Sequence, residues 1–223
     1  MKLTEQPLIR TTLARFAAFA ALMSSLSLNA APALDFSLSG AHLENQSVTG
    51  TLGWEFSVNQ AITITHLGLF DLGQDGLAES HAIGIWNVTG GNPLFQATIP
   101  AGNATSLDGK FRYVQIPDTI LQPGNYVIGA QYFGVSADSR VSEATGITTD
   151  PSITYLGGRY EIGSNLPFPN TPSGSGHYFG PNFQVVPEPS SIALFSIGGL
   201  VLATGLIRKQ KTGARKVGNH VGE

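Results

Sequence analysis

The chain of 223 residues contains no cysteine, which excludes a thiolate nucleophile, a disulfide framework and a cysteine-based zinc site. Basic residues are scarce in its middle. Residues 34–186 contain four Lys and Arg against twelve Asp and Glu, a net charge of −8. A surface of that sign repels phosphate, so we expect no nucleic-acid partner.

Long segments without glycine or proline are also lacking. Residues 34–186 contain 21 Gly and 9 Pro, and the longest stretch free of both is the 14 residues 54–67. Because that stretch is rich in β-branched residues, it favours a strand, and no long helix has room to form. The segment suits one domain, which can bury roughly 68–70% of its unfolded surface.

Short strands between turn residues predict an all-β fold, an antiparallel β-sandwich of jelly-roll type over residues 34–186. In the strand 62–70, Ile62 and Ile64 are expected to point to one face and Leu67 and Leu69 to the other, so both faces should be covered. The run 121–126, Leu-Gln-Pro-Gly-Asn-Tyr, resembles a sandwich corner in which the Tyr126 hydroxyl bonds upstream backbone. The expected strands are Thr51–Val58, Ile62–Phe70, His81–Asn87, Pro93–Ile99, Phe111–Ile116, Tyr126–Tyr132, Ile153–Tyr160 and Asn182–Val186.

The N-terminus has the pattern of a secretory signal peptide. Arg10 and Arg15 precede an apolar run over 16–28, and Ala31-Pro32-Ala33 provides an A-x-A-like site. We therefore expect residues 1–33 to be removed on export, with cleavage after Ala30 or Ala31 as alternatives.

The C-terminal region has an uncharged stretch of 16 residues, 192–207, followed at once by Arg208, Lys209 and Lys211. As a helix it would rise roughly 24 Å, somewhat less than the bilayer core. Thinning of the bilayer or snorkelling of the flanking Arg and Lys side chains accommodates this difference. The basic cluster then predicts a cytoplasmic C-terminus. The alternative for a stretch of this length is a buried core helix.

The order of features at 187–215 adds a resemblance. Pro187, Glu188 and Pro189, then the apolar helix, then the basic cluster resemble the PEP-CTERM sorting tail of Gram-negative bacteria. The resemblance implies that an exosortase-type protease recognises the three motif residues. It also implies an inner-membrane intermediate that is released to the cell surface or the extracellular polysaccharide. Two prolines keep this motif extended ahead of the helix.

The middle of the chain carries a second resemblance. The segments 64–71, 75–81, 84–86 and 111–113, together with the Leu121 corner, resemble an uncharacterised β-sandwich ectodomain that is frequent in PEP-CTERM proteins. That resemblance implies a fold and no activity.

One spacing suggests a metal ion. Asp71 and Asp75 in a glycine-rich turn, with Glu79 nearby, echo part of an oxygen-ligand calcium loop, although Gly73 and Ala82 occupy two ligand positions. The alternative is a solvated turn between strands. No other cofactor is expected, because His66, His81 and His177 lack the spacing of a zinc site.

Catalytic signatures are missing from the sequence. No G-x-S-x-G elbow frames a serine, and no carboxylate pair has a glycosidase signature. We therefore expect a secreted, non-catalytic surface or matrix protein, not an enzyme. The alternatives are, second, a carbohydrate-binding or adhesion module, with a calcium-stabilised variant of it, and third, an extracellular hydrolase. The six aromatics that could stack on sugar are Trp54, Trp86, Tyr132, Tyr155, Tyr160 and Tyr178.

Overall fold

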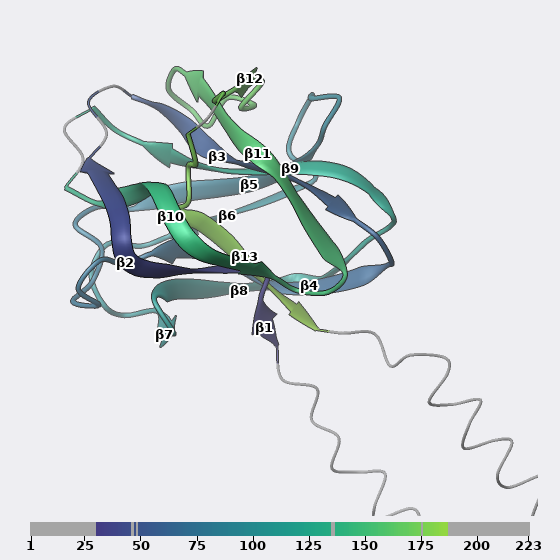
Figure 1. Cartoon of the computed structure of the whole chain (residues 1–223), viewed down its shortest axis with the longest axis horizontal. Coiled ribbons are helices and arrows are strands. Elements are labelled where there is room, and N and C mark those ends of the chain that lie inside the picture. Colours follow the sequence, from purple (N-terminus) through teal and green to yellow (C-terminus); the bar gives the residue numbers. More distant parts are fainter. Residues whose placement is uncertain (1–29, 46, 48, 135–136, 175, 187–223) are drawn as a thin grey trace, which may run out of the picture.

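The computed structural model describes residues 30–45, 47, 49–134, 137–174 and 176–186, and every element in them is a β-strand (Figure 1). No helix in these ranges is long and apolar enough to cross a bilayer. The predicted helix 192–207, the sorting motif 187–189 and residues 1–29 of the predicted signal peptide lie outside them. The strands are β1 (Ala31–Pro32), β2 (Leu34–Asn45), β3 (Gly50–Val58), β4 (Ile62–Phe70), β5 (His81–Asn87), β6 (Phe95–Ile99), β7 (Ser106–Asp108), β8 (Phe111–Leu121), β9 (Gly124–Tyr132), β10 (Ser139–Thr149), β11 (Ile153–Ile162), β12 (Thr171–Pro172) and β13 (Pro181–Val186).

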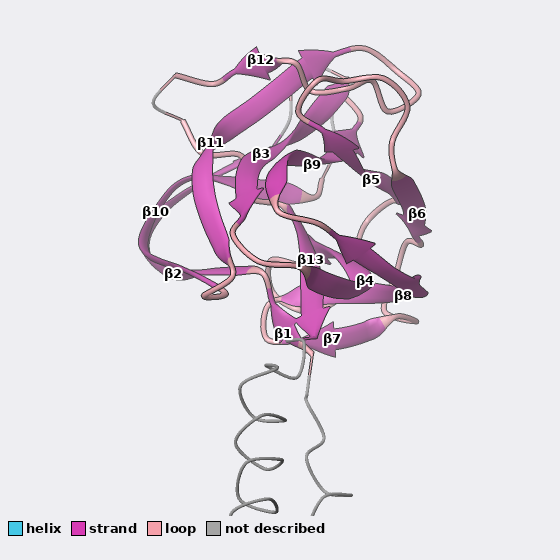
Figure 2. Ribbon diagram, turned by 90° about the vertical axis from the view of Figure 1, so that its right-hand side faces the viewer, coloured by secondary structure: helices cyan, strands magenta, loops and turns pink. Residues whose placement is uncertain are grey.

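The strands form three antiparallel sheets. A six-stranded sheet has the order β12-β11-β3-β9-β5-β6, and a five-stranded sheet has the order β1-β13-β4-β8-β7. Figure 2 shows the first above the second. The remaining pair, β10 and β2, is long and irregular, with three register shifts. The expectation of an all-β, antiparallel domain is therefore confirmed.

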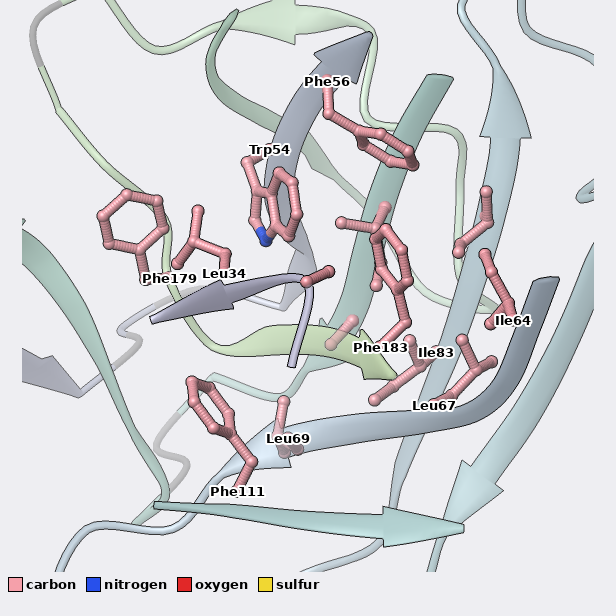
Figure 3. Close-up of a cluster of buried hydrophobic side chains, with 14 of the residues drawn as sticks. Leu34, Trp54, Phe56, Ile64, Leu67, Leu69, Ile83, Phe111, Phe179 and Phe183 are labelled. Carbon is pink, nitrogen blue, oxygen red and sulfur yellow. The ribbon is translucent and has the colours of Figure 1, made fainter. Parts of the chain in front are cut away.

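Aromatic side chains from both large sheets fill the space between them. Trp54 of β3 stacks on Phe183 of β13 at 5.9 Å between ring centroids, and Phe56 contacts the same ring at 5.1 Å. The Trp54 indole Nε1 donates to the Pro181 carbonyl at 2.8 Å, so its one polar atom is satisfied inside the core. Figure 3 shows Phe183 between these rings and Ile83 of β5.

All eight predicted strands overlap observed ones, and the bounds of β4 and β5 are the predicted ones. One detail within β4 was wrong. A register shift between Ile64 and His66 reverses the side-chain alternation, so Ile62 and Ile64 before it and Leu67 and Leu69 after it are all buried in one core cluster. The expected split of these four residues between two faces does not occur.

The Tyr126 corner is confirmed. The Tyr126 hydroxyl donates to the Gln122 carbonyl at 2.9 Å, four residues upstream. Its ring packs 5.8 Å from that of Phe56, so the corner is fastened both to the backbone and to the core.

The two ends of the described domain lie side by side. Ala31 pairs with Val185 and Pro32 with Gln184, so β1 and β13 are neighbouring strands (Figures 1 and 2). The fold therefore begins before residue 34, the predicted start of the domain. Ala33 is fully buried, donates its amide to the Phe183 carbonyl at 2.8 Å and accepts a bond from the Asp150 amide at 3.0 Å.

Candidate functional site

The turn after β4 contains Asp71, the first predicted calcium ligand, which is paired with an arginine. Asp71 is buried, and its Oδ2 accepts a hydrogen bond from Arg112 Nε of β8 at 2.6 Å. The same oxygen accepts from the Gly76 amide at 3.1 Å, across a turn in which Gly73, Gln74 and Gly76 all have positive φ. The Asp71 carboxylate is thus neutralised by a guanidinium and orders the turn.

Arg112 also connects this turn to a second loop. Its terminal nitrogens donate to the carbonyls of Gln74, Asn103 and Thr105 at 3.1–3.3 Å. Its side chain is 5% exposed and that of Asp71 is 2% exposed. The Asp71–Arg112 ion pair is therefore buried and holds the two loops together.

The three predicted calcium ligands are not brought together as one group. In the described part of the chain, the group of three His, Asp or Glu side chains close enough to share an ion is Glu79, His81 and Asp138, whose ligand atoms lie within 4.8 Å of one another. Glu79 belongs to both sets. Asp71 and Asp75 do not belong to this one.

His81, the first residue of β5, has no exposed surface. Its Nδ1 lies 2.8 Å from the Gln131 carbonyl oxygen of β9, and its Nε2 lies 2.9 Å from Asp138 Oδ2. The Tyr132 ring packs against the imidazole at 5.0 Å between centroids. Both ring nitrogens are therefore fixed in direction.

Asp138 lies between β9 and β10 and accepts hydrogen bonds at both oxygens. Burial raises its pKa, but bonds from His81 and from the Ala78 and Glu79 amides, at 2.9 and 3.1 Å, outweigh this and hold the pKa below its ordinary value. The carboxylate is accordingly ionised near neutral pH.

One oxygen of this cluster, and the hydroxyl of the tyrosine whose ring packs on His81, are buried without a hydrogen-bond partner in the described residues. They are Oε1 of Glu79 and the hydroxyl of Tyr132. Burial, and then the charge of Asp138, raise the pKa of Tyr132, so its hydroxyl stays protonated. Unpartnered buried polar atoms are few in proteins and indicate either strain or an interaction with a further group.

The other two histidines named above have separate surroundings. His66 bonds the neighbouring Thr65 hydroxyl at 2.9 Å, and His177 bonds the Tyr155 hydroxyl at 2.8 Å while stacking on Phe179. Burial lowers the pKa of both imidazoles. Neither belongs to the Glu79 group.

Three of the six candidate sugar-stacking aromatics are core residues. Trp54, Trp86 and Tyr132 are at most 1% exposed. Tyr160 and Tyr178 meet edge to face, with ring planes at 78°. The Arg140 guanidinium covers the Tyr178 ring at 4.4 Å from its centroid. Tyr160 and Tyr178 therefore do not form a flat surface on which a sugar ring could stack.

The spacing of the histidines in the sequence assigns His81 no metal-binding role, and nothing in the sequence singles out Asp138. Glu79 and His81 are two residues apart, which is a weak signal, but Asp138 is 57 residues from His81. The pairing of β5 with β9 carries the chain back past His81 just before Asp138. That proximity depends on the sheet order and has no signature in local spacing.

Comparison with known proteins adds nothing to the geometry: no family model, no curated protein and no solved structure matches this chain.

Proposed function

We propose that this chain is an exported, non-catalytic β domain of a Gram-negative bacterium, sorted to the cell surface or polysaccharide matrix through its C-terminal tail. The observation that carries the proposal is the order of Pro187-Glu188-Pro189, the apolar stretch 192–207 and the basic residues Arg208, Lys209 and Lys211. An exosortase-type protease is the proposed partner. The membrane holds the chain only until the tail is cut.

The position of the two ends supports this role. Because β1 and β13 are paired neighbours, an N-terminal signal and a C-terminal tail would both join the domain at the same end. Such a domain can be held at a membrane by one end while the rest of its surface stays free. A signal-peptide cut after Ala30 would leave β1 and the buried Ala33 intact in the mature protein.

The inaccessibility of two groups suited to acid–base chemistry, Asp71 and His81, supports a non-catalytic role. A hydrolase needs its acid, base or nucleophile within reach of the substrate. In the described residues, Asp71 is committed to Arg112, and His81, beside two carboxylates, has no exposed surface. We therefore rank a hydrolase below a surface or matrix protein.

A carbohydrate-binding or adhesion module is the second candidate. Sugar platforms use exposed, coplanar aromatic faces, and Tyr160 with Tyr178 has neither parallel rings nor an uncovered Tyr178 face. We propose that any association with polysaccharide follows from where the protein is sorted.

Within the all-β class we propose a jelly-roll assignment. Successive strands cross repeatedly between the two large sheets, from β3 to β4, β4 to β5, β6 to β7 and β8 to β9. Such crossing is typical of double-sheet folds built from Greek keys.

The test of the sorting proposal is Glu188→Ala in the full chain, followed by cell fractionation and mass measurement. We expect the variant to remain full length in the inner membrane. The matched control is Glu223→Ala, which removes a carboxylate C-terminal to the tail and should be processed normally. If Glu188→Ala reached the surface at the normal mass, the motif would have no role in sorting.

A further inference from the structure

The cluster of Glu79, His81 and Asp138 has no part in the proposed sorting. We propose that these three side chains bind one divalent transition-metal ion, of which zinc fits best, and that this ion fastens the β4–β5 connection to the β9–β10 connection. The three ligand atoms come from those two connections and from the first residue of β5, all within 4.8 Å.

The protonation of His81 is the first argument. The Gln131 carbonyl can only accept, so Nδ1 carries a proton. In a neutral imidazole, Nε2 then presents a lone pair, and it faces the Asp138 carboxylate oxygen Oδ2 at 2.9 Å. Two acceptors at this distance repel unless a proton or a metal ion is shared between them.

The environment of Glu79 favours a metal ion over a proton between His81 Nε2 and Asp138 Oδ2. A proton on Nε2 satisfies Asp138 but leaves Glu79 Oε1, which is buried and has no hydrogen-bond partner among the described residues. With an imidazolium, the two carboxylates leave the cluster at −1. With a neutral imidazole and a divalent ion, the cluster is neutral, and a third ligand is supplied to the ion.

The surroundings match those of metal-binding side chains. A ligating histidine usually donates its other N–H to a backbone carbonyl, which fixes the tautomer, as Nδ1 does to Gln131. The amides of Ala78 and Glu79 orient the Asp138 carboxylate in the same manner. Zinc bonds of about 2.0–2.2 Å place tetrahedral ligands about 3.4 Å apart, so His81 and Asp138 need to separate by only about half an ångström.

The ligand types select the ion. Calcium and magnesium prefer oxygen ligands alone, whereas one imidazole nitrogen with two carboxylates suits zinc and its neighbours. Three protein ligands leave a fourth position for water. This site differs from the calcium turn predicted from sequence, in which Asp71 is already paired with Arg112.

The experiment is isothermal titration of the untagged full chain, stripped with chelator and exchanged into chelator-free buffer, with zinc chloride. Glu79→Gln removes one ligand from a partly exposed side chain with little risk to folding. Asp75→Asn is the matched control, an exposed carboxylate four residues earlier. His42→Gln controls for an exposed histidine next to Glu44. Cobalt absorption in the visible range gives a second readout of coordination.

We expect one zinc per chain, a Kd at least tenfold weaker in Glu79→Gln and in a second variant, Asp138→Asn, and no change in the two controls. Far-UV circular dichroism of each variant checks its fold. The proposal is overturned by absence of saturable zinc binding, by wild-type affinity in Glu79→Gln, or by loss of binding in Asp75→Asn. Saturable binding of calcium but not zinc would equally overturn it.

Discussion

Replacing Arg112 with methionine should strongly destabilise the domain, because it removes one partner of a buried ion pair. Arg112 Nε bonds Asp71 at 2.6 Å, and the two side chains are 5% and 2% exposed. Methionine keeps much of the apolar stem but leaves the Asp71 charge buried without its cation. Removing one partner of such a pair costs about 3–5 kcal/mol, a large part of a typical stability of about 5–15 kcal/mol.

The assay is urea unfolding of the wild type and of the variant, monitored by circular dichroism. Lys110→Met is the matched control, because Lys110 is two residues away and pairs with Asp35, whose side chain is 50% exposed. Lys110 Nζ also donates to the Phe36 carbonyl and lies 4.8 Å from the centroid of the Phe36 ring. Losing these contacts and a pair with so exposed an end should cost about 1–2 kcal/mol, less than the loss of Arg112. The unfolding slopes should stay equal if only stability changes.

A double variant separates the charge from the packing. Asp71→Asn combined with Arg112→Met removes both charges, and asparagine keeps an acceptor for the Gly76 amide. The carbonyls of Gln74 and Asn103 belong to exposed residues and can bind water instead of Arg112. We expect the double variant to be more stable than Arg112→Met alone by at least about 1 kcal/mol. If Arg112→Met costs less than about 1 kcal/mol, or if the double variant recovers nothing, the buried-pair argument fails.

Two further predictions concern single side chains. Tyr126→Phe should keep the fold but lose the 2.9 Å bond to the Gln122 carbonyl, lowering the free energy of unfolding by about 0.5–1.5 kcal/mol, and an unchanged urea midpoint would refute this role of the hydroxyl. His177 should make the domain less stable in mild acid: burial lowers its folded pKa, so the unfolded chain binds more protons, and the stability present above about pH 6.5 is lost as pH falls toward the folded pKa. Urea midpoints at pH 7.5 and pH 5 should differ less in His177→Gln than in the wild type, and an equal difference in both would show that His177 does not contribute.

The core strands could be predicted from sequence because their apolar and β-branched residues are dense between turn residues. The pair β2 and β10 could not. After Phe36, β2 continues as Ser-Leu-Ser-Gly-Ala-His, and Leu38 and Leu43 are more than a third exposed. This strand is held by pairing with β10, at a distance of about 100 residues, through a ladder with three register shifts. Local propensity contains no information on such pairing.

The bulge in β4 is missed for a related reason. Alternation assigns Ile64 and Leu67 to opposite faces, and one extra residue of β4 in its ladder with β13, between Ile64 and His66, reverses that assignment. The consequence is visible at Gly68, where a Cβ would lie 2.3 Å from the Tyr113 ring, so only glycine fits under that side chain. The glycine is in the sequence, but the ring that requires it is known only from the β4–β8 register.

The calcium turn and the Glu79 cluster differ in how far each could be predicted from the sequence. The turn was predicted from three carboxylates within nine residues, which states how much negative charge is present but not which cation balances it. Arg112, from the next strand in the sheet, provides that cation for Asp71. Glu79, eight residues later, faces a neighbour of the same sign, Asp138, and a histidine whose proton is directed toward Gln131. In a domain with a net charge of −8, excess negative charge is therefore balanced by an arginine at one place and is left for an ion at the other.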